Sequence, residues 1–420
     1  MNRQGSSAVF LSLILATLMA ITLSLVMSAR SQAETSVADG TLHLGCDSVL
    51  SGYNYYVQRD YGLFLMQGTD SEHSRRLRSY VLCTLNSFDD INAGEIRVNA
   101  GRYSAVNTEP VRQQILDYMK SGGGIGLNED DTASEDVGDG AGSGGSVNGV
   151  SVDGDSGYIM PARTLRHGPT VTGLPSRSLP DKSLLASAKR LGENMKNPSV
   201  IFSGGTNRYL LDSYILDIFN CEARANDENH FFRNEVEYIL CGELSDEKNL
   251  KKTDRALVLL RTGLNLSHIY SDKTKTAAVA AAAEVLTPGI LGTVTQAGIA
   301  ALWAGAEALN DVKLLHSGYR VPIIKNSASW AVDLDSLIEG YNAESGMIKP
   351  SVNEGRLYRD YLRILLFTKD NDVTTARILD LIQINMRKNY DGQFLVQECV
   401  TGVSIDAKIN GRTLKYDKTY

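Results

Sequence analysis

The sequence predicts an α+β protein in which a single N-terminal transmembrane helix continues into a mixed head, followed by a helical middle region and C-terminal antiparallel strands. Three observations lead to this fold class. Residues 6–29 carry no charge, apolar residues recur at helical spacing through much of the second half, and residues 403–410 alternate between apolar and polar. These patterns divide the chain into four parts: an anchor (1–30), a membrane-proximal helix with an α+β head (31–120), an acidic linker or disordered insertion (121–180) and a mainly helical region ending in a β-hairpin (181–420).

The composition is that of a folded protein. The 420 residues are 43% hydrophobic and 22% charged, with a formal net charge of -7, which excludes wholesale disorder and a multi-span transporter. Lys and Arg are scattered rather than clustered, so no nucleic-acid partner is expected. The five cysteines are widely spread without a CxxC pair, which argues against a disulfide scaffold and a cysteine zinc site.

The uncharged run 6–29 is long enough to anchor the protein in a lipid bilayer. Its 24 residues would form about 36 Å of helix, against a hydrocarbon core of about 30 Å. A cleaved signal peptide with a small-x-small site at residues 31–33 is the alternative, but the run exceeds a usual h-region of about 7–15 residues. Arg3 and the amino terminus precede the run, and Arg30 follows it, but Glu34 and Asp39 come soon after. This small charge bias favours a cytoplasmic N-terminus and an extracellular body at the cell membrane.

Small residues recur every fourth position within this run, at Ser12, Ala16, Ala20 and Ser24. Residues four apart lie on one face of a helix, so these four form a nearly continuous stripe. Helices in lipid associate through close packing and polar contacts rather than through hydrophobicity. The stripe is therefore expected to pack against another membrane protein, and the alternative is a plain anchor whose small residues have no such role.

The head begins with an extension of the same helix. No proline interrupts residues 30–56, although Gly40 and Gly45 each weaken a helix by about 1 kcal/mol relative to Ala. The sequence then predicts the remaining elements of the head, which are a short turn into a buried strand over 61–66, a helix over 72–87, a strand around Ile96 and Val98, and a helix over 109–120.

Residues 121–157 consist mainly of Gly, Ser, Asp, Glu and Asn. Such a segment cannot bury enough apolar surface to offset its ordering entropy, so a disordered acidic linker is expected. Pro, Gly and Ser remain common to about residue 180.

The second half is predicted to be helical and then β. The expected helices cover 235–241, 245–270, two parts of 275–315 separated by Pro288-Gly289, 357–367 and 373–390. The hydroxyl of Ser245 is expected to cap its helix. Asn410-Gly411 predicts a hairpin between the last strands. Residues 285–303 carry no charge, but their Ala, Gly and Thr content favours packed helices over a second membrane span.

Four short segments contain residue types that could carry chemistry. The glycine run 121–126 lacks the spacing of a phosphate-binding loop, and residues 153–155 lack the ligand spacing of a calcium loop. Ser245 and Lys248 match the SxxK pattern without its companion triplets. Asp227, Glu228 and His230 could ligate a metal, but such a group more often caps a helix. No catalytic residue, cofactor or metal is therefore expected, and the protein is predicted not to be an enzyme.

Four tyrosines crowd the region where the long helix meets the head: Tyr53, Tyr55, Tyr56 and Tyr61. Tyrosines at such a junction usually pack with their hydroxyls at the surface, and a binding patch is the alternative.

Several segments carry a family resemblance: Gly5–Leu13, Ala29-Arg30, Tyr61–Phe64, Asp117–Lys120, Glu237–Gly242, Arg320–Lys325 and Tyr358–Leu362. With these segments the chain resembles an uncharacterised family of single-pass membrane proteins from clostridia and their relatives. Members of that family often resemble components of Tad-type (Flp) pilus assembly, especially the TadE and TadG minor pseudopilins.

The resemblance implies an accessory, pseudopilin-like component of a Tad-like pilus or secretion apparatus, with other membrane or pilus-assembly proteins as partners. It also implies a leader-processing junction at Gly5 and Ser6. Pilin-like proteins usually place Glu at the fifth mature position, and this chain has Phe10 there. An anchored surface binding module unrelated to pili is the alternative function.

Overall fold

The computed structural model describes residues 3–86, 88, 91–122, 162–166, 171, 173–194, 205–223, 228–289, 292–342 and 344–420. The chain divides into two compact units. Unit 1 contains Met1–Asp60, Phe64–Pro110 and Gln397–Tyr420, and unit 2 contains Tyr61–Leu63 and Val111–Val396. The C-terminal strands therefore belong to the same unit as the N-terminal helix rather than to the helical region 181–420.

The described residues form helices and antiparallel strands, as the sequence predicts. The described residues contain thirteen α-helices, one two-stranded sheet and one three-stranded sheet. The first helix is long and apolar, and the last strands are antiparallel, so the predicted α+β class is confirmed.

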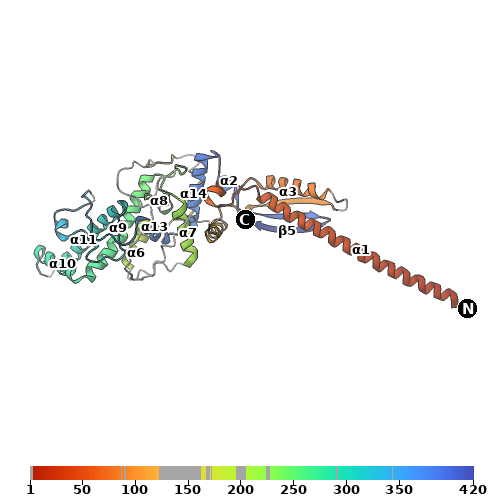
Figure 1. Cartoon of the computed structure of the whole chain (residues 1–420), viewed down its shortest axis with the longest axis horizontal. Coiled ribbons are helices and arrows are strands. Elements are labelled where there is room, and N and C mark those ends of the chain that lie inside the picture. The colour runs from red at the N-terminus through yellow and green to blue at the C-terminus, as the bar shows by residue number, and fades with distance from the viewer. Residues whose placement is uncertain are drawn as a thin grey trace, which may run out of the picture. The chain divides into compact units, whose positions relative to one another are not determined.

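Unit 1 is dominated by α1 (Arg3–Leu50), a helix of 48 residues and about 72 Å. Its N-terminal part extends beyond the other elements of unit 1 (Figure 1). Its last turns bury a stripe at helical spacing that includes Ala38, Leu42, Cys46 and Val49. Of the described helices, α1 alone is long and apolar enough to cross a membrane.

A three-stranded antiparallel sheet forms the rest of the unit 1 framework. It contains β2 (Ala93–Asn99), β4 (Gly402–Ile409) and β5 (Arg412–Thr419) in the order β2-β4-β5. Asn410 and Gly411 join β4 to β5 with φ angles of 48° and 77°, so the predicted hairpin is confirmed. A smaller sheet pairs β1 (Met66–Gln67) with β3 (Cys399–Val400).

The core of unit 1 lies between this sheet and two helices. The inward residues of β4 (Val403, Ile405, Ala407 and Ile409) form one apolar cluster with α1 and α3 (Asp70–Leu85). A capping box between Thr69 and Glu72 begins α3. Gly45 allows the close approach of the two helices, because a Cβ there would lie 2.7 Å from the Leu77 Cδ1 atom.

Unit 2 is helical in its described residues. Its helices are α4 (Thr108–Lys120, in this unit from Val111), α6 (Leu184–Asn194), α7 (Gly205–Ile218), α8 (Glu235–Cys241), α9 (Asp246–Ser271), α10 (Lys273–Leu286), α11 (Gly292–His316), α12 (Leu334–Ile338), α13 (Tyr358–Phe367) and α14 (Asn371–Asn389). Every residue of α14 from Val373 to Met386 is buried, so this helix forms the centre of its part of the core. A second apolar cluster joins α9, α10 and α11 around Trp303 and Trp330.

Most predicted helices are confirmed, with boundaries shifted by two residues or fewer. The extension of α1 is shorter than expected, because it ends at Leu50 rather than near Tyr56. The Asn54 side chain accepts hydrogen bonds from the backbone of Tyr56 (3.0 Å) and Val57 (3.2 Å), and so begins the separate helix α2 (Tyr55–Tyr61). The strand expected at the end of 61–66 is short, since β1 consists of Met66–Gln67.

The linker expected over 121–180 does not extend through all of these residues. Residues 123–161, 167–170 and 172 lie outside the described part of the chain. Residues 162–166 and 173–180 are held in unit 2, where the Leu165 N–H donates to the Leu244 carbonyl (2.8 Å) and the Ser176 N–H donates to the Asp380 carboxylate (3.1 Å).

Two further expectations concern unit 2. The run 285–303 forms the end of α10, a turn and the first half of α11, and its Ile299, Ala300 and Trp303 are buried in the second cluster. This supports packed helices over a second span. Ser245 does precede α9, but its hydroxyl makes no capping hydrogen bond. The neighbouring Asp246 carboxylate is turned away from its own helix and accepts the N–H groups of Arg163, Arg233 and Asn234.

Candidate functional site

Two features stand apart from ordinary packing in the described residues, one in each unit. The first is the exposed half of α1. Large apolar side chains along it are 44–71% exposed over residues 9–27. Burial of this surface in lipid would be strongly favourable, at about 25 cal/mol per Å².

Three hydroxyl groups in this half of α1 have hydrogen-bond partners that suit an apolar environment. Ser12 donates to the Val9 carbonyl (2.8 Å), Thr17 to the Ile14 carbonyl (2.8 Å) and Thr22 to the Met19 carbonyl (3.0 Å). Because lipid offers no hydrogen-bond partners, a polar group in the bilayer core must be satisfied within the protein. These three hydroxyls meet that condition within the helix itself.

The predicted packing stripe lies on this half of α1. Ser12, Ala16, Ala20 and Ser24 are all helical and exposed, so each is available to a partner as far as the described residues extend. Gly5 and Ser6, the predicted processing junction, lie in the first turns of the α1 backbone, and their side chains are outside the described part.

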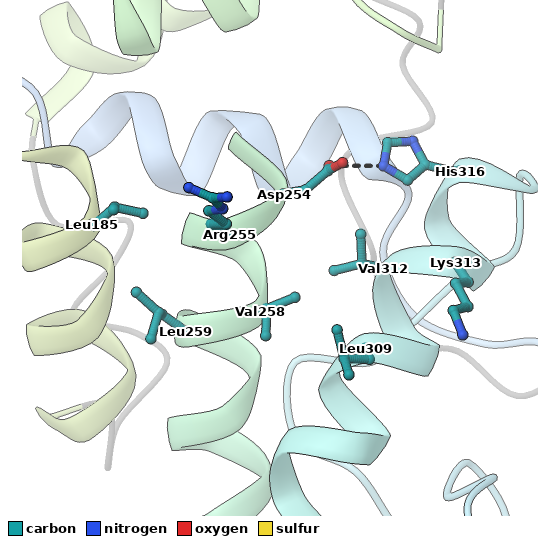
Figure 2. A pocket seen from close by; sticks show the side chains of 9 residues that line it. All are labelled: Leu185, Asp254, Arg255, Val258, Leu259, Leu309, Val312, Lys313 and His316. Atoms are coloured by element: carbon teal, nitrogen blue, oxygen red, sulfur yellow. Dashed lines mark hydrogen bonds and ion pairs between the residues drawn. The ribbon is translucent and has the colours of Figure 1, made fainter. Parts of the chain in front are cut away.

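The second feature is a groove in unit 2, here called the α9 groove, with a volume of about 550 Å³. Its floor is α9, and its walls come from α6 and α11 (Figure 2). The apolar lining residues are Leu185 of α6, Val258 and Leu259 of α9, and Leu309 and Val312 of α11. In Figure 2, Leu259 faces α6 and Val258 faces α11, so apolar side chains line both halves of the groove.

A histidine–carboxylate pair closes one end of the α9 groove. His316 Nε2 lies 2.8 Å from Asp254 Oδ1, and the two side chains are 26% and 30% exposed. Burial by itself lowers the pKa of His316, but the hydrogen bond and charge of Asp254, with the charges of Glu222 and Glu237, outweigh it and raise the pKa above its ordinary value. The pair therefore joins the last residue of α11 to α9 at this end of the groove.

Two other cations line the α9 groove. Lys313 is held by the Tyr341 hydroxyl (3.3 Å) and by the carbonyls of Asn342 (3.1 Å) and Ser345 (2.6 Å). Arg255 is exposed and forms no hydrogen bond or ion pair with any residue that the structure describes. The groove is thus mostly apolar, and Arg255 is the basic side chain in its lining that has no partner among the described residues.

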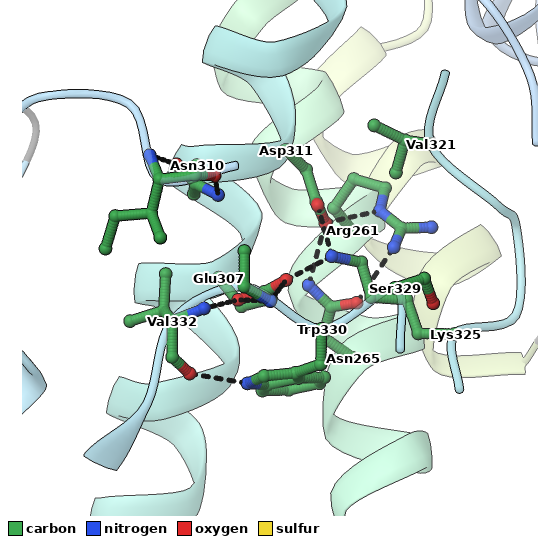
Figure 3. Close-up of polar contacts among 12 residues, drawn as sticks. Arg261, Asn265, Glu307, Asn310, Asp311, Val321, Lys325, Ser329, Trp330 and Val332 are labelled. Atoms are coloured by element: carbon green, nitrogen blue, oxygen red, sulfur yellow. Dashed lines mark hydrogen bonds and ion pairs between the residues drawn. The ribbon is translucent and has the colours of Figure 1, made fainter. Parts of the chain in front are cut away.

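A fully buried cluster of charges lies between α9 and α11, and its role is structural (Figure 3). Arg261 Nε lies 2.9 Å from Asp311 Oδ2, and Lys325 Nζ lies 2.6 Å from Asp311 Oδ1 and also contacts Glu307. Two acids thus balance two bases, each side chain being at most 1% exposed. The cluster joins α9 and α11 to the loop that carries Lys325 and is closed to a substrate.

The remaining sequence candidates are dispersed. His230 contacts the buried carboxylate of Glu235, while Asp227 lies outside the described residues. The Ser245 hydroxyl accepts a hydrogen bond from the Thr164 hydroxyl (3.3 Å). Within the described ranges, no three His, Cys, Asp or Glu side chains gather as a metal site requires.

The four tyrosines do not form one patch. Tyr53 packs edge-on against Phe64 (5.0 Å between ring centroids) in unit 1, and Tyr61 stacks on Phe219 (5.9 Å) in unit 2. Tyr55 and Tyr56 are exposed beside Arg59. Packing therefore accounts for Tyr53 and Tyr61, and the exposed pair stays open to a binding role.

The sequence did not indicate the α9 groove. His316 and Asp254 are 62 positions apart, so no local motif joins them. The sequence predicts both helices, and the available signal is the pair of apolar lining positions on each (Val258 and Leu259, Leu309 and Val312), but helical periodicity does not say which helices pack together.

Comparisons with known proteins identify a family but no individual relative. No curated protein and no solved structure matches the chain. One family model matches residues 169–411, which include most of unit 2 together with β3 and β4 of unit 1. Since this match covers more than half of the sequence, the chain belongs to the Family of unknown function (DUF5702).

Proposed function

We propose that the protein is a non-enzymatic, membrane-anchored extracellular subunit, and that it serves as an accessory, pseudopilin-like component of a Tad-like pilus or secretion apparatus. The observation that carries the proposal is the division of α1. Its first half exposes apolar side chains on all sides, and its last turns pack on a three-stranded antiparallel sheet.

This division gives α1 two roles in one rigid element. A continuous helix connects the bilayer to the folded head without a flexible joint, as the N-terminal helix of pilin-like subunits does. The packed half is fixed by Leu42, Cys46 and Val49, which lie in one apolar cluster with α3 and the sheet. The exposed half is then free to contact lipid and neighbouring helices. Pilin-like subunits support this role by analogy of architecture.

Assembly would depend on close packing rather than on charge. Phe10 stands where pilin-like subunits usually carry a glutamate. The stripe of Ser12, Ala16, Ala20 and Ser24 offers the alternative, because small side chains let two helix backbones approach closely in lipid. The proposal therefore assigns partner contact to the stripe.

Crosslinking in intact cells, followed by identification of the partners, tests this proposal. The variant Ala16→Leu/Ala20→Leu keeps the span apolar while it blocks close approach. We expect it to insert into the membrane normally and to lose at least four-fifths of its crosslinks to membrane proteins. The expected partners are Tad-like membrane proteins that work together with a secretion ATPase.

A control variant separates packing from a general effect of leucine. At about 100° per residue, Thr22 and Ala29 lie on the side of α1 opposite the stripe. Thr22→Leu/Ala29→Leu should insert equally well and keep its crosslinks. Equal crosslinking by all variants would reduce α1 to an anchor and contradict an assembly role.

The α9 groove favours the second candidate function, an anchored surface binding module unrelated to pili. A concave, mostly apolar site of about 550 Å³ has the size of a small-molecule pocket. Partners that crosslink through α1 and belong to a pilus apparatus favour the first candidate. A ligand bound to unit 2 in a protein without such partners favours the second.

A further inference from the structure

We infer that the α9 groove binds a single acyl chain with a carboxylate head, that is, a fatty-acid anion, whose head pairs with Arg255 and whose chain lies over Val258 and Leu259. The inference concerns unit 2 alone and does not depend on the assembly role proposed for α1. It rests on the shape, the apolar lining and the charge of the groove.

The lining is suited to an acyl chain. Five aliphatic side chains from three helices line the groove, and Leu259 remains 36% exposed. A volume of about 550 Å³ falls within the range of about 300–1,000 Å³ typical of small-molecule sites. Burial of each methylene group contributes about 0.8 kcal/mol. The chain would therefore provide most of the affinity.

The charges of the groove select an anion. Its lining contains one carboxylate, Asp254, and three basic side chains, Arg255, Lys313 and His316. Asp254 is paired with His316 at 2.8 Å, and Lys313 is held by three oxygen acceptors. This leaves Arg255 as the base without a partner among the described residues, in a protein whose formal net charge is -7.

Arg255 has the geometry for a carboxylate. A guanidinium presents a planar pair of N–H groups that matches the two oxygens of a carboxylate in a bidentate pair. Arg255 precedes Val258 by one helical turn on α9, so a head bound at Arg255 places its chain along the apolar floor. A cationic amphiphile would meet repulsion at the same position.

Calorimetric titration of the full-length protein in lipid nanodiscs tests the inference, with empty nanodiscs subtracted to remove partitioning into lipid. The probes are hexanoate, octanoate, decanoate and octanol. We expect saturable binding of octanoate at one site per chain, with affinity rising about three- to fourfold for each added methylene. Octanol should bind at least fivefold more weakly than octanoate.

Two variants and one control complete the test. Arg255→Gln should weaken octanoate binding at least fivefold and leave octanol binding unchanged, and Leu259→Asp should abolish binding of both. Lys248→Gln removes the same charge from an exposed position two turns earlier on α9, outside the groove, and should have no effect. Since all three positions are exposed, the fold should be retained.

Two results would overturn the inference. Absence of saturable octanoate binding would exclude an acyl-chain site. Equal loss of octanoate binding in Arg255→Gln and Lys248→Gln would show that general electrostatics, and not Arg255, attracts the anion. Neither result bears on crosslinking through α1, so failure here is distinct from failure of the proposed assembly role.

Discussion

At the scale of single residues, Arg261 shows how unit 2 tolerates buried charge. Its guanidinium donates to the Asp311 carboxylate, to the Asn265 side chain, to the Tyr361 hydroxyl and to the carbonyls of Pro322 and Ile323, at 2.9–3.1 Å. All three nitrogen atoms of the guanidinium thus donate a hydrogen bond. A buried charge is stable only when it is paired and hydrogen-bonded in this way.

Arg261→Lys should therefore destabilise unit 2 although it keeps the positive charge. An ammonium group cannot reach the same acceptors, and the buried carboxylate and carbonyls lose partners, so we expect a loss of about 3–5 kcal/mol. Urea unfolding of the detergent-solubilised chain measures it. Arg190→Lys, at an exposed position on α6, should stay within about 0.5 kcal/mol of the parent. Equal effects of the two substitutions would contradict the structural role of the cluster.

Glu237 makes a pH-dependent contribution. It is buried, accepts hydrogen bonds from the Tyr358 hydroxyl (2.9 Å) and the Glu222 N–H (3.1 Å), and burial raises its pKa from 4.5 to about 7. The folded state therefore binds a proton that the unfolded state releases between these values. The stability that this difference in pKa provides is fully present below about pH 4.5 and is lost as the pH rises through about 7.

Glu237→Gln keeps both hydrogen-bond acceptor roles and removes the titration. Relative to the parent, we expect this variant to gain stability between pH 5 and pH 8, by up to about 3 kcal/mol. Unfolding in urea at the two pH values measures the difference. The exposed Glu247→Gln should leave the pH dependence nearly unchanged. A Glu237→Gln effect that is the same at both pH values would show that the carboxyl group is ionised throughout.

At the scale of elements, a strong apolar periodicity predicts a helix or strand correctly, whereas polar residues at inward positions hide the periodicity of others. The alternation of β4 and the apolar faces of α8, α9 and α14 led to correct elements. The helix α7 was not predicted, because Arg208 and Asp212 occupy inward positions and pair with each other at 2.9 Å. A pattern of apolar residues cannot report a helix whose core face contains an ion pair.

Gly45 shows a different limit of propensity. It weakens the sequence argument for α1, yet its missing Cβ allows α3 to approach. Gly45→Leu should therefore overpack unit 1 and lower its stability by about 1–3 kcal/mol. Gly40→Leu provides the matched control, because a Cβ at Gly40 meets nothing within 4 Å. It should be neutral or stabilising. Thermal unfolding in detergent compares the two, and equal destabilisation would contradict close α1–α3 packing.

At the scale of the whole molecule, pairing between distant segments is what the sequence could not provide. Arg97 of β2 faces Asp406 of β4, more than 300 positions away. The alternation and Asn410-Gly411 correctly predict a hairpin in the tail, but nothing in this pattern says that the hairpin belongs to unit 1. The α9 groove is a second example, since it too is made by helices brought together from separate parts of the chain.

Removal of the tail tests this long-range pairing. Truncation after Thr401 removes β4 and β5, and so uncovers the apolar face of α1 and α3. In the full chain, Cys83 is exposed and Cys46 is buried, so a maleimide should label Cys83 first. In the truncated chain we expect Cys46 to label at a rate close to that of Cys83. Continued protection of Cys46 would mean that the hairpin does not cover α1.

The central claim is that α1 holds the protein in the membrane with its folded units outside. Protease treatment of sealed, right-side-out membrane vesicles that contain the full chain with a C-terminal epitope tests this claim most directly. The account predicts that the protein sediments with the vesicles, resists alkaline extraction, and loses its epitope to protease while the vesicles stay sealed. An epitope that remains protected until the vesicles are opened, or a soluble protein that begins at Glu34, would contradict it.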